Sequence, residues 1–180
     1  MQDILRRSLA PITEAAWNEI DEEAKATLQT YLSARSNVDV TEPQGWSAAA
    51  VNLGRLDVHP DETEDGVTWG RRKVQPLVEV RVPFVLKQME IDNITRGAHD
   101  ADLDPLVDAA RRIATFEEKA IYLGFPDGDI DGICGASPYE PLPLSGDVEQ
   151  ITLATADAVK QLQTAGIDGP YALVLPAEAY

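Results

Sequence analysis

The sequence predicts an α+β fold, because segments with two different hydrophobic periods follow one another along its 180 residues. Apolar residues recur at helical spacing in three long segments, 13–34, 105–123 and 148–165. Between the first two, residues 51–86 contain runs in which apolar and polar side chains alternate, as they do in strands. A chain of this length is sufficient for one good core, or for two small lobes that share one.

The first predicted helix, residues 13–34, begins at Thr13, which suits the N-cap position after Pro11. Glu14 lies in the first turn, where the helix dipole favours an anion. One apolar stripe runs along this helix and consists of Trp17, Ile20, Ala24, Leu28 and Leu32. Such a stripe normally faces a core. The alternative is that part of it forms an open groove for a partner.

Residues 38–86 predict a long β-hairpin. Pro76 and Pro83 cannot donate backbone hydrogen bonds, so its returning arm is expected at a sheet edge or outside a central sheet. A hairpin of this character often reaches out to a neighbour. The expected pieces are strands at 51–53 and 56–58, an acidic turn at 61–66, and a returning arm at 67–69 and 74–86, with Val78, Val80, Val82, Phe84 and Leu86 on one face.

The second half of the chain predicts further helices and a last strand. Gly97 closes a short helix at 90–96, and Asp104-Pro105 opens the long helix that ends before Gly124. Residues 125–146 are rich in Gly, Pro and Asp and predict an irregular loop. The last two predicted elements are a helix at 148–165, with Ile151, Ala158, Val159 and Leu162 facing inward, and a buried strand at 171–175.

Composition limits the possible functions. The formal net charge is −16, from 31 acidic and 15 basic residues, so the surface repels phosphate backbones and no nucleic-acid partner is expected. The basic runs Arg6-Arg7 and 71–73 are short and are interpreted as solvated faces. No apolar run approaches the roughly 20 residues of a membrane span, and the N-terminus does not resemble a signal peptide. A cytoplasmic location without membrane contact follows as the default.

The sequence predicts no catalytic residue, no metal site and no cofactor, and therefore a protein that is not an enzyme. His59 and His99 lie in polar stretches without ligand spacing, and the single cysteine, Cys134, has no neighbouring base and is expected to be a buried or inert thiol. Residues 127–132 reproduce the D-x-D-x-D-G opening of a calcium loop. However, Pro138 occupies the place of the bidentate glutamate.

An ordered set of segments resembles the encapsulin family of bacterial and archaeal nanocompartment shell proteins. The resemblance covers nearly the whole chain, apart from residues 134–150. The matching segments are 5–13, 17–21, 35–40, 45–46, 73–84 (KVQPLVEVRVPF), 91–93, 96–97, 110–114, 117–118 and 166–174 (GIDGPYALV).

The resemblance implies the fold of tailed-phage major capsid proteins and four regions. These are an N-terminal helical arm at 1–45, an extended E-loop at 46–86, a P domain with its long spine helix at 87–124, and an A domain at 125–180. Encapsulins continue well beyond Tyr180, so the chain is expected to lack the part that completes the A domain.

The resemblance also implies a function and a site. Shell subunits assemble into an icosahedral cage and enclose dye-decolorizing peroxidases or ferritin-like iron-oxidising proteins, whose C-terminal targeting peptide docks on the inner surface. The matching groove positions here are Leu28, Leu32, Arg35 and Asp39. A purely intramolecular role, in which Arg35 and Asp39 tie the helix end to the P domain, stays open.

Two other interpretations also stay open. One is a phage or prophage capsid subunit, which shares the fold. The other is an enzyme such as a hydrolase, because members of the family have also been labelled bacteriocins or proteases.

Overall fold

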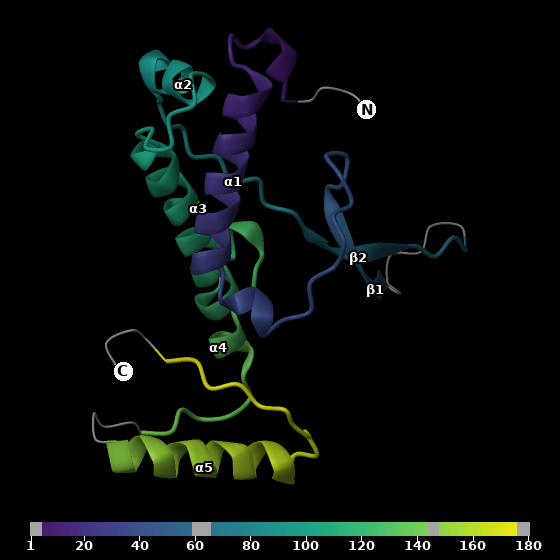
Figure 1. Cartoon of the computed structure of the whole chain (residues 1–180). Coiled ribbons are helices and arrows are strands. Elements are labelled where there is room, and N and C mark those ends of the chain that lie inside the picture. Colours follow the sequence, from purple (N-terminus) through teal and green to yellow (C-terminus); the bar gives the residue numbers. More distant parts are fainter. Residues whose placement is uncertain (1–4, 59–65, 144–147, 176–180) are drawn as a thin grey trace. The chain divides into compact units, whose positions relative to one another are not determined.

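The computed structural model describes residues 5–58, 66–143 and 148–175. The chain divides into two compact units, Met1–Ala136 and Ser137–Tyr180. The first unit contains most of the regular structure, and the second contains one long helix (Figure 1). The elements are α1 (Glu14–Tyr31), β1 (Ala50–Val58), β2 (Gly70–Pro76), α2 (Gln88–Thr95), α3 (Asp104–Leu123) and α4 (Ile133–Ala136) in the first unit, and α5 (Val148–Thr164) in the second.

Helix α1 confirms the first predicted helix except for its last turn. The Thr13 side chain accepts a hydrogen bond from the Ala16 amide at 3.3 Å, which satisfies one of the free amides of the first turn. At the other end, Leu32 leaves the helical region with φ −90° and ψ 67°. The predicted continuation to residue 34 is therefore wrong, and a separate 3₁₀ turn, Ala34–Ser36, follows.

Helices α2 and α3 confirm the predictions for residues 90–96 and 105–123. Each is followed by a glycine with a positive φ, +96° at Gly97 and +89° at Gly124, a conformation that other residues rarely adopt. Pro105 lies in the first turn of α3, where its missing amide proton costs no helical hydrogen bond.

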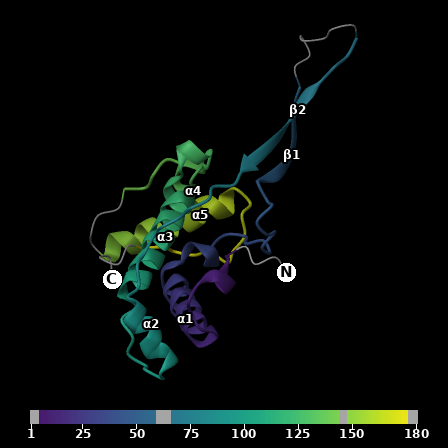
Figure 2. The same cartoon turned by 90° about the horizontal axis from the view of Figure 1, so that it is seen from above.

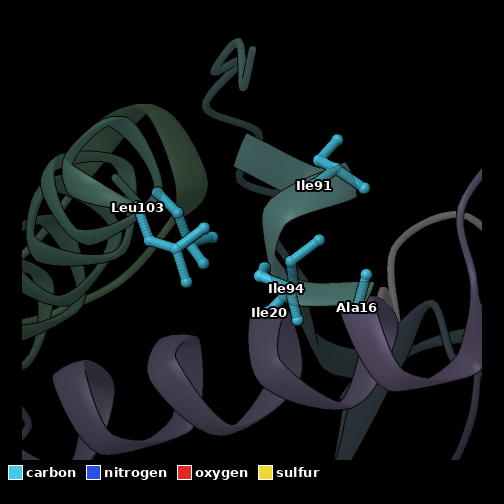
Figure 3. Packing of buried hydrophobic residues seen from close by; sticks show 6 residues of the cluster. Ala16, Ile20, Ile91, Ile94 and Leu103 are labelled. Atoms are coloured by element: carbon cyan, nitrogen blue, oxygen red, sulfur yellow. The ribbon is translucent and has the colours of Figure 1, made fainter. Parts of the chain in front are cut away.

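The core of the first unit lies where α1, α2 and the start of α3 meet (Figure 3). Helix α1 packs along α3, and three buried alanines on α3, at 109, 110 and 114, leave room for a close approach. The central cluster consists of Ala16, Ile20, Ile91, Ile94, Leu103 and Leu106. The predicted stripe on α1 therefore faces the core at Ile20, with Trp17 and Ala24 packed beside it.

Strands β1 and β2 pair antiparallel as a hairpin (Figures 1 and 2). The two short strands predicted at 51–53 and 56–58 are one strand, interrupted by a bulge between Asn52 and Arg55. Gly54 permits this bulge with φ +67°, and its amide donates a hydrogen bond to Asn52 Oδ1 at 2.9 Å.

The returning arm predicted at 74–86 is confirmed as a strand only over residues 74–76, which belong to β2, and is wrong beyond Pro76. Regular pairing ends at Pro76, and residues 77–87 are extended without forming a strand. The proline amides cannot donate, and the last bond across the hairpin is from the Leu77 amide to the Ala49 carbonyl at 3.0 Å. The predicted turn at 61–66 lies, apart from Gly66, outside the described residues.

In the second unit, α5 confirms the predicted helix at 148–165, although its four predicted inward residues are only half-buried. The buried strand predicted at 171–175 is wrong. Leu173 and Val174 are 58% and 49% exposed, and this segment pairs with no strand in the described part of the chain. An isolated extended segment without hydrogen-bond partners is not stabilised as a strand.

The loop predicted at 125–146 holds two short turns of helix, a 3₁₀ turn at Pro126–Gly128 and α4. Cys134 lies in α4 and is exposed, so of the expected alternatives, a buried or an inert thiol, the first is wrong. No helix among the described residues is both long and apolar enough to cross a membrane.

Candidate functional site

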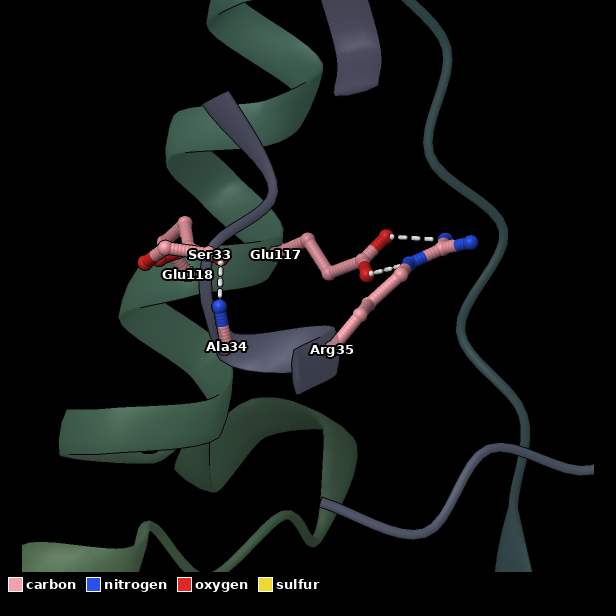
Figure 4. A network of polar contacts seen from close by, with 5 residues as sticks. All are labelled: Ser33, Ala34, Arg35, Glu117 and Glu118. Carbon is pink, nitrogen blue, oxygen red and sulfur yellow. Dashed lines mark hydrogen bonds and ion pairs between the residues drawn. The ribbon is translucent and has the colours of Figure 1, made fainter. Parts of the chain in front are cut away.

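The junction between the end of α1 and the middle of α3 is held by two neighbouring glutamates (Figure 4). Glu117 pairs with Arg35: the guanidinium Nε donates to Oε1 at 2.5 Å and Nη2 donates to Oε2 at 2.8 Å. This two-bond geometry fixes both the distance and the orientation of the guanidinium plane.

Glu118 holds the chain segment that precedes Arg35. Its Oε1 accepts the Ala34 amide at 2.8 Å, and its Oε2 accepts the Ser33 hydroxyl at 2.6 Å. Ala34 is fully buried, so its amide would otherwise lack a partner. One carboxylate thereby satisfies the backbone where α1 has ended and the 3₁₀ turn begins.

The charge of Arg35 is stabilised by this arrangement. The hydrogen bonds to Glu117 raise the pKa of Arg35 above its ordinary value, because they favour the charged form more than partial burial disfavours it. The guanidinium is still half-exposed, with 51% of its side-chain surface accessible. Arg35 therefore presents a permanent positive charge at the surface with one side already occupied by Glu117.

A pocket of about 800 Å³ lies beside this junction, between α3 and the extended segment that follows β2. Its walls are mostly apolar, and three carboxylates belong to the lining. At one end, the Gln75 side-chain amide donates to the Gly128 carbonyl at 3.2 Å. The lining residues are Asp39, Gln75, Pro76, Leu77, Val78, Val80, Ile113, Phe116, Glu117, Ala120, Ile121, Ile130 and Asp131. An apolar trough with a charged rim fits an extended peptide that carries apolar and cationic side chains.

The structure brings together only part of the predicted site. Asp39 lines the pocket, and Arg35 reaches it through Glu117. Leu28, on α1, and Leu32, directly after it, are half-buried and are not among the lining residues. The intramolecular role considered for Arg35, a tie from the helix end to α3, is present in the structure. Asp39 is exposed.

The α3 side of the pocket was not predicted from the sequence. Ile113, Phe116 and Ile121 were expected only as part of the helix, and Phe116 also stacks edge-to-face on Phe125 with ring centres 5.1 Å apart. The sequence did contain one indication of the opposite wall of the pocket. The alternation that includes Val78 and Val80 predicts both side chains on one face of the chain, and both line the pocket.

The segment that resembles a calcium loop forms a tight turn. Phe125 and Ile130 exchange both backbone hydrogen bonds, at 2.8 and 3.1 Å, and Asp129 takes a positive φ of 54° to close it. Within the described ranges, no three His, Cys, Asp or Glu side chains gather in a way that could hold a metal ion. His99 is exposed, and His59 lies outside the described residues.

Comparison with known proteins shows the family to which the chain belongs. A family model described as "Encapsulating protein for peroxidase" matches residues 1–180. The chain is 46% identical to the type 1 encapsulin shell protein of Mycolicibacterium paratuberculosis over 98% of its length, and 45% identical to that of Rhodospirillum rubrum over 100%. It is 41% identical to the shell protein of Mycobacterium tuberculosis over 98%.

In each case the chain spans 66% of the relative's length, just under two thirds. The matched part includes α1, the hairpin, α3 and both glutamates of the junction. Because the match runs along the whole chain, this protein belongs to the encapsulin family of encapsulating proteins for peroxidase.

Proposed function

We propose that this chain is a structural subunit of an encapsulin nanocompartment, which assembles with copies of itself into an icosahedral cage and performs no catalysis of its own. The observation that carries the proposal is the match of all 180 residues to a family of encapsulating proteins, together with 46% identity to a shell protein. The names of these relatives favour an encapsulin over a phage capsid subunit and over a hydrolase.

The finer assignment of regions belongs to the same proposal. Helix α3 serves as the spine helix of a P domain at 87–124, and residues 46–86 form an E-loop that reaches a neighbouring subunit. The arm at 1–45 and an A domain at 125–180 complete the tailed-phage capsid fold. The exposure of nearly every residue of β1 supports the E-loop role, because a hairpin without a buried face in its own chain is suited to a neighbour.

The cargo in this proposal is a dye-decolorizing peroxidase or a ferritin-like protein, held through its C-terminal targeting peptide. The docking surface combines Leu28, Leu32, Arg35 and Asp39, and the pocket beside them extends it along α3. The mixed lining of that pocket supports a peptide ligand, since apolar walls provide affinity and charged rim residues provide orientation. Localisation of the cage in the cytoplasm follows from this role.

Electron microscopy of the purified 180-residue polypeptide, beside a version extended to the full length of its relatives, tests the shell role. Closed particles from the extended form are expected. Only small oligomers from both would contradict the proposal and would reopen the search for an activity.

Peptide binding tests the groove separately. Leu32→Ser should weaken binding of a fluorescent peroxidase targeting peptide about tenfold or more, because a buried leucine contact of roughly 1.5–3 kcal/mol is lost. Leu153→Ser, an exposed position of α5, is the matched control and should leave binding unchanged. Equal binding by both variants and the unmodified chain would remove Leu32 from the site.

A further inference from the structure

The same three residues, Ile-Asp-Gly, occur twice in the chain, at 130–132 and at 167–169. An aspartate that precedes glycine is especially prone to rearrange without an enzyme, because glycine has no Cβ atom to hinder its nitrogen as that nitrogen approaches the carboxyl group. The reaction also requires the glycine peptide plane to turn toward the carboxyl carbon. The two copies therefore differ in reactivity chiefly through the fold around them.

The first copy is held rigidly. Ile130 exchanges both backbone hydrogen bonds with Phe125, at 2.8 and 3.1 Å, and the Gly132 carbonyl accepts an amide of α4 at 2.9 Å. Gly132 is buried, and a Cβ atom added to it would lie 2.2 Å from the Gly124 nitrogen. The peptide plane that follows the aspartate therefore cannot turn without displacing the backbone at the end of α3.

The second copy lies in the turn after α5, where Asp168 and Gly169 are both exposed. In the described part of the chain, the Gly169 amide donates no hydrogen bond and the Asp168 carboxylate forms no ion pair. Two hydrogen bonds of Ile167 hold this turn: its amide donates to the Leu162 carbonyl at 3.0 Å, and its carbonyl accepts the Tyr171 hydroxyl at 2.6 Å. Neither bond engages the nitrogen or the carboxyl group that would react.

The chain contains two further Asp-Gly pairs. At Asp127-Gly128 the glycine is buried and its amide donates to the Phe125 carbonyl at 3.0 Å, so the nitrogen is already engaged. Asp65, which precedes Gly66, lies outside the described residues. Among the three pairs that the structure describes in full, only the pair at 168–169 combines an exposed glycine with an unbonded amide.

We propose that Asp168 is a site of spontaneous rearrangement to isoaspartate, through a cyclic imide formed with Gly169. The Gly169 nitrogen bonds to Asp168 Cγ and loses its proton, the hydroxyl of the protonated carboxyl group leaves, and water is released. Water then opens the ring. Cleavage of the bond between nitrogen and Cγ restores aspartate, whereas cleavage of the bond to the main-chain carbonyl carbon gives isoaspartate. The water released in the first step is consumed in the second, so the reaction needs no co-reactant.

The product differs from the original chain in its backbone and not in its charge. Isoaspartate lengthens the main chain by a methylene group between α5 and the segment at 171–175, and it keeps a free carboxylate. The inference goes beyond the proposed shell function and does not depend on it.

Incubation in heavy-oxygen water measures the reaction at each site. The full chain is kept for several weeks at neutral pH and physiological temperature and is then digested with trypsin in ordinary water. Each ring opening leaves a solvent oxygen on the residue, whichever bond breaks. Cleavage after Lys160 separates Asp168 from Asp127 and Asp131, which share a peptide. Fragmentation of the peptides in the mass spectrometer distinguishes these two sites and also distinguishes isoaspartate from aspartate.

In the folded chain, Asp168 should take up heavy oxygen at least about tenfold faster than Asp131, because the fold raises the barrier only at Asp131. In urea the two Ile-Asp-Gly copies should react at similar rates. Asp168→Glu should abolish uptake at its own site, since glutamate would have to form a six-membered ring. Asp131→Glu, the matched control, should leave the rate at Asp168 unchanged.

A rate at Asp168 in the folded chain that is no greater than the rate at Asp131 would overturn the proposal. Uptake of heavy oxygen at Asp168 without any isoaspartate would also overturn it, because the ring would then reopen only to aspartate. The shell function would be unaffected by either result.

Discussion

Arg35 and Glu117 are joined by two hydrogen bonds, of 2.5 and 2.8 Å, across 82 positions of the sequence. The pair ties the 3₁₀ turn after α1 to the middle of α3 and lies at the edge of the pocket that Asp39 and Glu117 line. It therefore connects the position of α1 to the shape of the candidate docking surface.

Removing this pair should change stability only slightly. Arg35→Ala is expected to lower the free energy of unfolding by about 0.5–1 kcal/mol, because half-exposed ion pairs are screened by water. Urea denaturation followed by tryptophan fluorescence measures the effect, and a double-mutant cycle with Glu117→Ala isolates the coupling. A loss of several kcal/mol would show that the pair is much less screened than its exposure indicates.

Glu118 should matter more than its neighbour. Glu118→Leu leaves the amide of the fully buried Ala34 without its acceptor, which should cost about 1–3 kcal/mol. Glu118→Gln keeps an acceptor oxygen and should recover most of that loss. The same urea titration compares the two variants. If both lost equal stability, the negative charge of Glu118 rather than its acceptor role would be the stabilising feature.

Asp21 links the stability of α1 to pH. The hydrogen bonds from Arg7, at 2.6 and 2.7 Å, hold the pKa of Asp21 below its ordinary value of 3.8. Folding therefore favours the carboxylate, and this contribution is present above about pH 4 and is lost as the pH falls through the lowered pKa. Both side chains are partly exposed, so the contribution at neutral pH should be at most about 1 kcal/mol.

The expected result is a lower thermal midpoint for Asp21→Asn at pH 5–7 and a difference that disappears as the solution is acidified below about pH 4. Glu19→Gln, an exposed carboxylate of the same helix, is the control. A difference between Asp21→Asn and the unmodified chain that stayed constant down to pH 2 would contradict the linkage to Arg7.

Substitution in the core cluster should reduce stability more than the changes above. Leu106 is 5% exposed, so Leu106→Ala should lower the free energy of unfolding by about 2–4 kcal/mol through lost burial and the cavity that remains. Leu123→Ala removes the same atoms from the 70% exposed end of α3 and should cost less than about 0.5 kcal/mol. Similar losses from the two would mean that the cluster is not the centre of the core.

The helices could be predicted from sequence because their boundaries depend on local chemistry. Thr13 caps α1 with its own side chain, and Gly97 and Gly124 take positive φ angles that end α2 and α3. Strands need partners from elsewhere in the chain. The apolar segments 77–86 and 171–175 look like strands but form none in the described structure, since no described segment pairs with them.

Of the candidate site, too, only a part could be predicted from the sequence. Asp39, one residue of the predicted groove, lines the pocket, whereas no role in the groove was predicted for Glu117, because its partner Arg35 lies so far away in sequence. An amphipathic period identifies which face of α1 is apolar. It does not identify which part of that face is covered by α3, and so it could not separate Ile20 in the core from Leu28 and Leu32 near the helix end.

The turn after α3 should tolerate no side chain at Gly132. A Cβ atom there would lie 2.2 Å from the Gly124 nitrogen and 2.3 Å from the Leu123 carbonyl carbon, and these backbone atoms cannot move without disturbing the end of α3. Gly132→Ala is therefore expected to lower the free energy of unfolding by about 2–4 kcal/mol, in the upper range for overpacking. Gly135→Ala is the matched control, because a Cβ atom there meets nothing within 4 Å and alanine favours the helical conformation of α4. Urea denaturation of both variants measures the difference, and equal stability would show that the close approach of Gly124 and Gly132 does not persist in solution.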